Sequence, residues 1–210
     1  MRIRTGTLED LTERIKRKAP EYFDLLTAAT DKDFQAAFNA VLQCAVAHLE
    51  KNKVNFSSLD EVGLTAVLVG NLSIPGLTVT QETHSNGHVD LTIEADHCMP
   101  ARTKLGEAKI YRGYKYHVEG LEQLLGRYTT GREGPGLLIV YVKKLGIADG
   151  IKTLRAGLDK KLPLSQKGPT QDYPLKWSFF SMHSHSCGDD LEVDHIGCNL
   201  YIDGLGGKTK

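Results

Sequence analysis

The sequence predicts an α/β domain with a mixed, centrally buried sheet and an N-terminal helical extension. Three observations support this fold class. Apolar residues recur at three- and four-residue spacing over residues 8–50, which is typical of amphipathic helices. Short alternating segments follow between residues 77 and 110, which is typical of strands. Residues 137–142 are continuously apolar, and such a run predicts a strand buried on both faces.

The bulk composition is that of one well-buried domain. The chain has 210 residues, 40% of them hydrophobic, and a formal net charge of zero, so a polyanionic partner has to be met by a local basic patch. The four cysteines are irregularly spread and the first residues lack an apolar run, so we expect a cytoplasmic protein without disulfides. The longest apolar run is far too short to cross a bilayer, so no membrane span is expected.

The first half of the chain is expected to be mostly helical. Asp31 or Asp33 is the expected N-cap of a helix that ends near residue 52. A further helix is expected from residue 57 to about 72, where Ser58 and Glu61 have the spacing of a capping box. Strands are then expected at 77–80, 87–94 and 104–110, and three strands in succession predict a meander.

The second half alternates between the two kinds of element. We expect a helix at 117–129, the buried strand at 137–142, a helix at 147–161, and strands at 175–184 and 191–202. The resulting organisation is an N-terminal helical extension at 1–57, a core at 58–203 and a flexible tail at 204–210.

Two carboxylates and one lysine fall in neighbouring strand-like segments. Asp90 lies in the segment 88–93, and Glu107 and Lys109 lie in the segment 105–110. Because alternate side chains of a strand share a face, Glu107 and Lys109 point the same way. If the two strands are neighbours, the three side chains converge. Two carboxylates suit Mg²⁺ or Mn²⁺, with waters and a substrate phosphate completing the shell, so the pattern favours phosphodiester hydrolysis.

This order of elements, with Asp90 on the second strand and Glu107-Ala-Lys109 on the third, resembles the PD-(D/E)XK nuclease superfamily, which has the restriction-endonuclease-like fold with an αβββαβ core. The resemblance covers roughly residues 58–145. It implies that Asp90, Glu107 and the Ala108 carbonyl bind the metal, and that Lys109 orients the attacking water. It further implies a metal-dependent endonuclease acting on DNA in a prokaryotic restriction, antiviral defence or repair setting.

The resemblance also points to residues on the helices around these strands. Many members carry a glutamate on the helix before the first core strand, and Glu61 is the best-placed match, with Asp60 as the second candidate. Some branches carry a Gln and a Tyr four residues apart on the following helix. Here Gln123 is followed by Arg127 at that spacing, and Tyr128 one residue later would not share its face on an α-helix. The residue before Asp90 is Val89, where the superfamily often has proline.

A basic and tyrosine-rich stretch follows the lysine. Residues 109–132 contain five basic and two acidic residues, and Tyr111, Tyr114 and Tyr116 interleave with the basic ones. Basic groups anchor phosphates and tyrosines stack on unpaired bases, which predicts DNA contacts from the following residues: Arg112, Tyr114, Lys115 and Arg127. Charges that merely complement helix ends are the alternative. Cleaving both strands of a duplex requires two sites, so a homodimer or higher homo-oligomer is expected, with a defence subunit as a further possible partner.

Several alternatives to a catalytic site stay open at the level of sequence. Glu107 and Lys109 could form a solvated ion pair on the sheet, and the capping box alone would explain Glu61. The whole chain could then be a catalytically inactive nucleic-acid-binding or regulatory module. A zinc-dependent interaction protein is the third alternative, built on a C-terminal set of histidines and cysteines: His183, His185, Cys187, His195 and Cys198.

Overall fold

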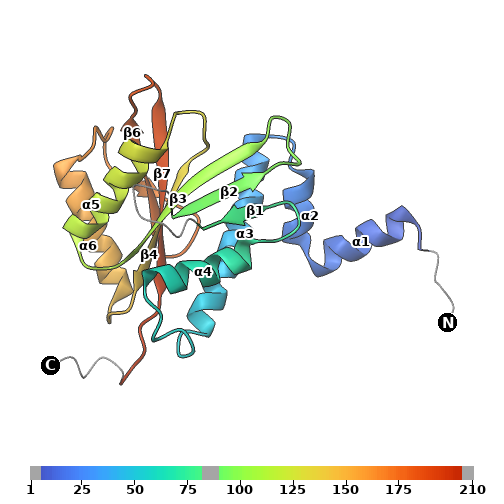
Figure 1. Cartoon of the computed structure of the whole chain (residues 1–210), viewed down its shortest axis with the longest axis horizontal. Coiled ribbons are helices and arrows are strands. Elements are labelled where there is room, and N and C mark those ends of the chain that lie inside the picture. Colours follow the sequence, from blue (N-terminus) through green and yellow to red (C-terminus); the bar gives the residue numbers. More distant parts are fainter. Residues whose placement is uncertain (1–5, 82–89, 205–210) are drawn as a thin grey trace.

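The computed structural model describes residues 6–81 and 90–204, and these residues form an α/β architecture, as predicted (Figure 1). One mixed sheet runs in the order β1-β2-β3-β4-β7-β6-β5. Its strands are β1 (Thr78–Thr80), β2 (Leu91–Ala95), β3 (Arg102–Ile110), β4 (Gly136–Val142), β5 (Gln171–Asp172), β6 (Ser178–Ser184) and β7 (Asp190–Asn199). The α-helices of the described residues are α1 (Leu8–Lys18), α2 (Pro20–Thr27), α3 (Asp31–Lys51), α4 (Glu61–Leu72), α5 (Tyr114–Gln123) and α6 (Ile147–Lys161).

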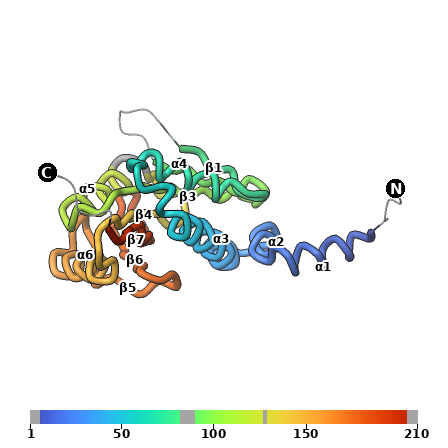
Figure 2. The backbone as a smooth tube through the Cα atoms, turned by 90° about the horizontal axis from the view of Figure 1, so that it is seen from below, coloured from blue at the N-terminus to red at the C-terminus, as the bar shows by residue number. Residues whose placement is uncertain are grey.

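The sheet lies between two pairs of helices. Strands β1, β2 and β3 form the predicted antiparallel meander, and β4 pairs in parallel with both β3 and β7. Every residue of β4 is buried, and alternate side chains enter a core with α3 and α4 on one face and a core with α5 and α6 on the other (Figure 2). The prediction of a strand buried on both faces is therefore confirmed.

The segment 1–57, expected as a helical extension, includes one helix that packs on the sheet. The apolar face of α3 belongs to the same buried core as Ala108 and Leu137. Helix α1 has no buried residue and projects away from the sheet (Figures 1 and 2). The N-cap of α3 is Thr30, not Asp31 or Asp33, because the Thr30 hydroxyl accepts the Asp33 N–H at 3.1 Å and the Asp33 carboxylate accepts the Thr30 N–H in return.

Helix α4 corrects the expected role of two residues. It begins at Glu61, and its N-cap is Asp60, whose carboxylate accepts the Gly63 N–H at 2.8 Å. The capping box expected from Ser58 and Glu61 is therefore wrong, because the nearer carboxylate of Asp60 takes the free N–H group. Glu61 occupies the first helical position and its side chain is available for a contact elsewhere.

The bounds of several strands and helices also differ from expectation. Within the described residues β2 begins at Leu91, so Asp90 lies one residue before the strand and not on it; the expected strand residues 87–89 lie outside the described residues. Helix α5 begins three residues earlier than expected and continues as a π-helical segment, η1 (Leu124–Tyr128). Helix α6 has the predicted bounds. Of the expected tail only Gly204 is described, and no described helix has the length and hydropathy of a membrane span.

Candidate active site

The end of β3 extends past the start of β2. Leu91 pairs with Gly106, so among the described residues no strand pairs with residues 107–110 on that side, while β4 pairs with them on the other. Two carboxylates accept the backbone N–H groups on this open side. Asp90 Oδ2 accepts from Ala108 N at 3.0 Å, and Glu61 Oε2 accepts from Ile110 N at 2.7 Å. The open side of β3 thus brings an acid from before β2 together with an acid from α4.

Glu107 and Lys109 complete this group of charged side chains. They share the face of β3 that is covered by α5, and Lys109 Nζ contacts Glu107 Oε1 and lies 3.6 Å from Glu61 Oε1. A Cβ at Gly120 of α5 would lie 3.0 Å from Lys109 Cγ, so the glycine provides room for the lysine stem. The three carboxylates and the lysine, hereafter the acidic site, therefore meet at one end of the sheet.

Burial controls the electrostatics of Glu107. Its residue exposure is 2%, and burial raises its pKa to about 7, opposed by the hydrogen bond from Lys109 and reinforced by the charge of Asp90. Burial also lowers the pKa of Lys109, but the contact with Glu107 and the charges of Glu61 and Asp90 outweigh this effect and leave the pKa raised. Lys109 is consequently an ammonium ion at neutral pH and acts as a hydrogen-bond donor, not as a base.

The donor atoms of the acidic site fit a magnesium ion better than a zinc ion. Among the described residues Glu107 Oε2 is buried without a hydrogen-bond partner, and Asp90 lies opposite Glu107 when the β2–β3 register is continued by one residue. The N–H and C=O of one strand residue point to the same side, so the Ala108 carbonyl also faces the open side of β3. Mg²⁺ needs only one or two protein carboxylates, with waters and phosphate supplying the rest.

A site made wholly of protein ligands is not present in the described part of the chain. No group of three or more His, Cys, Asp or Glu side chains in residues 6–81 and 90–204 is arranged to bind a metal ion. The oxygens of Glu61 are engaged by Ile110 N–H and by Lys109, so Glu61 positions β3 and the lysine and is not a free ligand. Asp90 and Glu107 remain as the carboxylates that could hold Mg²⁺ or Mn²⁺.

Tyr116 lies at the acidic site, although the sequence analysis selected Tyr114. The Tyr116 hydroxyl donates to Glu61 Oε2 at 3.5 Å, and its ring has Arg112 at 4.9 Å and Lys109 Nζ at 5.9 Å from the centroid. Tyr114 instead packs on α6, where a Cβ at Gly157 would lie 2.4 Å from its ring. Both tyrosines stand in the same basic stretch, so only the packing of α5 distinguishes them.

The remaining residues expected on α5 and beyond are less closely placed. Arg112 and Lys115 are exposed, and Lys115 lies 4.0 Å from Glu119 in a surface ion pair. Gln123 is half-buried, and within the described residues no hydrogen bond joins it to the acidic site. The side chains of Arg127 and Tyr128 lie outside the described residues. Their backbone is π-helical, with hydrogen bonds between residues five apart, so the α-helical spacing that separated Tyr128 from Gln123 does not hold there.

The C-terminal histidines and cysteines do not converge on one point. His183 and His195 are fully buried and both bond to Ser181 at 2.8 Å, whereas Cys198 is buried in the core on the opposite face of the sheet. Cys187 is exposed, and His185 lies 3.3 Å from the Thr129 hydroxyl. His117, which the sequence analysis did not single out, bonds to His195 at 2.9 Å. His117, His195, Ser181 and His183 thus form a hydrogen-bonded chain in the core, and the described residues of the C-terminal set are not arranged as metal ligands.

Comparison with known proteins gives no match. No protein-family model matches the chain, and neither a curated protein nor a solved structure is similar to it at the level required of a match. Function must therefore be argued from the acidic site itself.

Proposed function

We propose that the protein is a metal-dependent deoxyribonuclease of the PD-(D/E)XK type, with Mg²⁺ or Mn²⁺ as its cofactor. The observation that supports this proposal most strongly is the meeting of Asp90, Glu107 and Lys109 at the open end of β3. The element order α4-β1-β2-β3-α5-β4 is the order expected of a restriction-endonuclease-like core and adds to that support.

Each residue of the acidic site has a separate task in this reaction. Asp90 and Glu107 would hold the ion, with the Ala108 carbonyl as a further oxygen ligand. The bound ion supplies a Lewis acid for the phosphate oxygens and for the attacking water. Lys109 donates hydrogen bonds that orient the water and offset charge on the phosphate, while Glu61 fixes the position of its ammonium group.

The substrate contacts follow from the exposed basic groups beside the acidic site. Arg112 is exposed next to Tyr116 and is placed to bind a DNA phosphate. Cleavage of both strands of a duplex would use two copies of the chain related by twofold symmetry. The biological setting we propose is prokaryotic restriction, antiviral defence or repair in the cytoplasm, with or without a partner defence subunit.

A second candidate function is a catalytically inactive nucleic-acid-binding or regulatory module. One observation favours it: Asp90 and Glu61 each accept a backbone N–H of β3, which gives both carboxylates a structural task without any metal. This alternative predicts DNA binding without strand cleavage.

A plasmid-nicking assay distinguishes the two functions. We expect nicking that requires Mg²⁺ or Mn²⁺, is stopped by a chelator, and is abolished by Glu107→Ala and by Lys109→Ala. Matched controls are Glu13→Ala and Lys16→Ala, which remove an exposed ion pair of α1 at 3.4 Å and should leave nicking intact. Nicking that survives both site variants would overturn the proposal, and DNA binding without metal-dependent nicking would establish the inactive module.

A further inference from the structure

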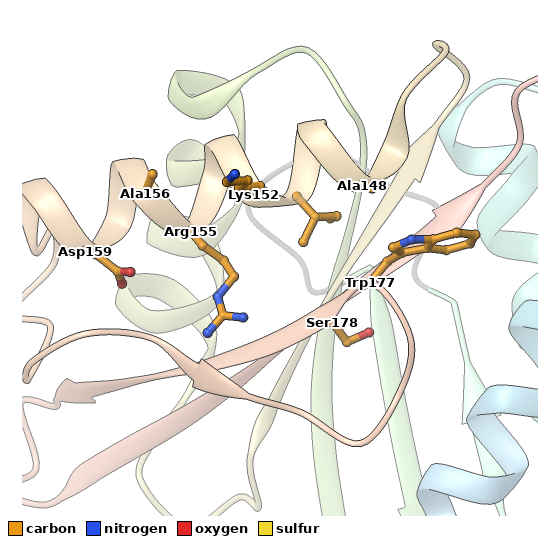
Figure 3. Close-up of a pocket in the computed structure, with 8 residues that line it drawn as sticks. Ala148, Lys152, Arg155, Ala156, Asp159, Trp177 and Ser178 are labelled. Carbon is orange, nitrogen blue, oxygen red and sulfur yellow. The ribbon is translucent and has the colours of Figure 1, made fainter.

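A basic groove lies between α6 and the start of β6, apart from the acidic site. It has a volume of about 450 Å³ and is lined by residues of α6 and by Trp177 and Ser178; the charged residues of this lining are Lys152, Arg155 and Asp159 (Figure 3). Figure 3 shows the Arg155 side chain reaching from α6 toward β6. The groove therefore combines cationic side chains with a large aromatic surface.

Three cationic side chains, Lys152, Arg155 and Lys176, stand against two carboxylates, Asp159 and Asp172, so three minus two leaves the groove one net positive charge. Lys152 is exposed on α6, and the ammonium group of Lys176 lies 4.4 Å from the centroid of the Trp177 ring. Arg155 is balanced by Asp172 at 2.7 Å, and the Asp159 carboxylate accepts the Thr170 N–H at 2.7 Å. A positive groove with an aromatic side chain is the combination by which proteins bind single-stranded nucleic acids.

The backbone of Trp177 has an unusual conformation. Its φ is +57°, which is rare for a bulky residue, and such strained residues cluster at functional sites. Gly197 on β7 permits this conformation, because a Cβ there would lie 2.7 Å from the Trp177 carbonyl oxygen. The strained backbone holds the indole at the edge of the groove, half-exposed to solvent.

Trp177 also lies in line with the catalytic lysine across the sheet. Lys109 pairs with Val140, Val140 pairs with Gly197, and Gly197 N–H donates to the Trp177 carbonyl at 3.1 Å. Trp177 packs against the core between the sheet and helices α5 and α6, and Lys109 lies against Gly120 of α5, so both side chains are on the same side of the sheet. Three strand spacings separate their backbones by about 14 Å, but Val140 and Gly197 between them are buried, so a substrate strand that reaches both sites has to pass around the helices that cover this line.

We propose that this groove binds an unpaired nucleotide of the nucleic-acid substrate, with its base stacked on Trp177 and its phosphates beside Lys152 and Lys176. The inference rests on the proposed nuclease function and specifies its substrate class: DNA with a single-stranded segment next to the cleaved bond. Stacking of a base on an indole is stronger than a cation–π contact at an exposed position. The base therefore displaces the Lys176 ammonium group from the ring, and the ammonium group moves to a phosphate.

The fluorescence of Trp177 tests this proposal without any cleavage. Trp177 is the only tryptophan of the chain, so the tryptophan signal reports on the groove alone. We expect a single-stranded deoxyoligonucleotide to quench it in the Glu107→Gln protein in the presence of a chelator, and a blunt duplex of the same sequence to quench it much less. Unchanged fluorescence at saturating single strand, or equal quenching by the duplex, would overturn the inference.

Affinity measurements on variants give an independent check. Trp177→Ala should weaken single-strand binding about 10-fold or more, and Trp177→Phe should restore most of the affinity. Lys152→Glu should weaken binding and reduce the slope of log affinity against log salt by about 0.7, the value for one phosphate contact to a single strand. Lys32→Glu, the same charge change on the exposed start of α3, is the matched control and should change neither.

Failure of the groove and failure of the nuclease give different results. If nicking depends on metal but Trp177→Ala leaves the affinity for single-stranded DNA unchanged, the groove proposal is overturned and the nuclease proposal is not. Quenching and tight single-strand binding without metal-dependent nicking would support the groove as a binding surface and overturn the nuclease.

Discussion

Glu61 Oε2 accepts the backbone N–H of Ile110 at 2.7 Å, which ties the first residue of α4 to the last residue of β3. The other oxygen of the same carboxylate faces Lys109 Nζ at 3.6 Å. One side chain therefore satisfies a strand N–H that no described strand pairs with and also fixes the ammonium group of the acidic site. The two tasks can be separated by substitution.

Removing Glu61 should affect stability and activity to different extents. Glu61→Ala leaves the Ile110 N–H without its acceptor, and we expect the free energy of unfolding to fall by about 1–3 kcal/mol. Glu61→Gln retains an acceptor oxygen but not the charge beside Lys109, so it should be nearly as stable as the wild type and still cleave more slowly. Urea denaturation and the nicking rate measure the two effects, with Glu119→Ala as an exposed control on α5. Equal stability losses for the two variants would contradict this division.

The pKa of Glu107 predicts an opposing effect of pH on stability and on metal binding. Burial raises this pKa from 4.5 to about 7, so between these values the folded chain binds more protons than the unfolded chain. The contribution of Glu107 to stability without metal should therefore fall as pH rises from about 4.5 to 7, by up to roughly 3 kcal/mol, and should then level off.

The variant Glu107→Gln isolates this contribution, because it removes the titrating carboxyl and keeps its shape. In urea unfolding from pH 5 to 8 in a chelator, the stability of the wild type minus that of the variant should decrease as pH rises to about 7, because the histidines titrate alike in both proteins. Mg²⁺ competes with the proton, so its stabilising effect in the wild type should increase through pH 7 and be absent in the variant. Parallel pH profiles for the two proteins would show that the Glu107 carboxyl is not perturbed by burial.

Gly120 of α5 should be required for activity more than for stability. A methyl group at this position would lie 3.0 Å from Lys109 Cγ and 3.2 Å from Cε, so Gly120→Ala should displace the ammonium group. We expect the nicking rate to fall roughly 10- to 100-fold, because small misplacements of catalytic groups have effects of this size. The helix propensity of alanine offsets about 1 kcal/mol of the packing penalty.

The matched control is Gly70→Ala in α4, where nothing lies within 4 Å of the new methyl group. This variant should be more stable by up to about 1 kcal/mol and cleave at the wild-type rate. Unimpaired nicking by Gly120→Ala would mean that the position of the Lys109 stem does not limit the reaction.

Local patterns were sufficient to predict the flanking helices of the sheet and its strands other than β5, the two-residue edge strand. The observed bounds of α6 match the predicted ones because its apolar periodicity lies between Gly146 and the sequence Leu162-Pro163, where the proline ends the helix. The burial of β4 follows from its uninterrupted apolar residues. Both patterns are complete within the segment itself, so they require no knowledge of the rest of the fold.

The contacts that make the acidic site could not be predicted in the same way. Glu61 bonds to Ile110, 49 residues away, and the capping spacing near Ser58 suggested a local role that Asp60 in fact performs. The choice between Tyr114 and Tyr116 depends on how α5 is rotated against α6. Such contacts arise when elements pack together, and side-chain spacing along one segment does not encode them.

The buried histidines should make the protein sensitive to acid. The Leu164 carbonyl only accepts, so His183 Nδ1 carries its proton and His183 Nε2 accepts from the Ser181 hydroxyl. Ser181 in turn accepts from His195 Nε2–H, and His195 Nδ1 accepts from His117 Nε2–H. This assignment requires His117, His183 and His195 to be neutral, and burial favours the neutral form by lowering the pKa of each of the three.

Burial lowers the pKa of His117 from 6.5 to about 4 and that of His195 well below its usual value. The unfolded chain then binds more protons than the folded chain between about pH 4 and 6.5, so stability falls as pH decreases through this range, by about 1.4 kcal/mol per pH unit for each histidine. His117→Gln keeps a donor for His195 and removes one titrating group. The slope of unfolding free energy against pH should therefore decrease by about 1.4 kcal/mol per pH unit, the value for one proton. A slope equal to that of the wild type would show that His117 is already protonated in the folded state, and would overturn the direction of hydrogen bonding assigned to the chain.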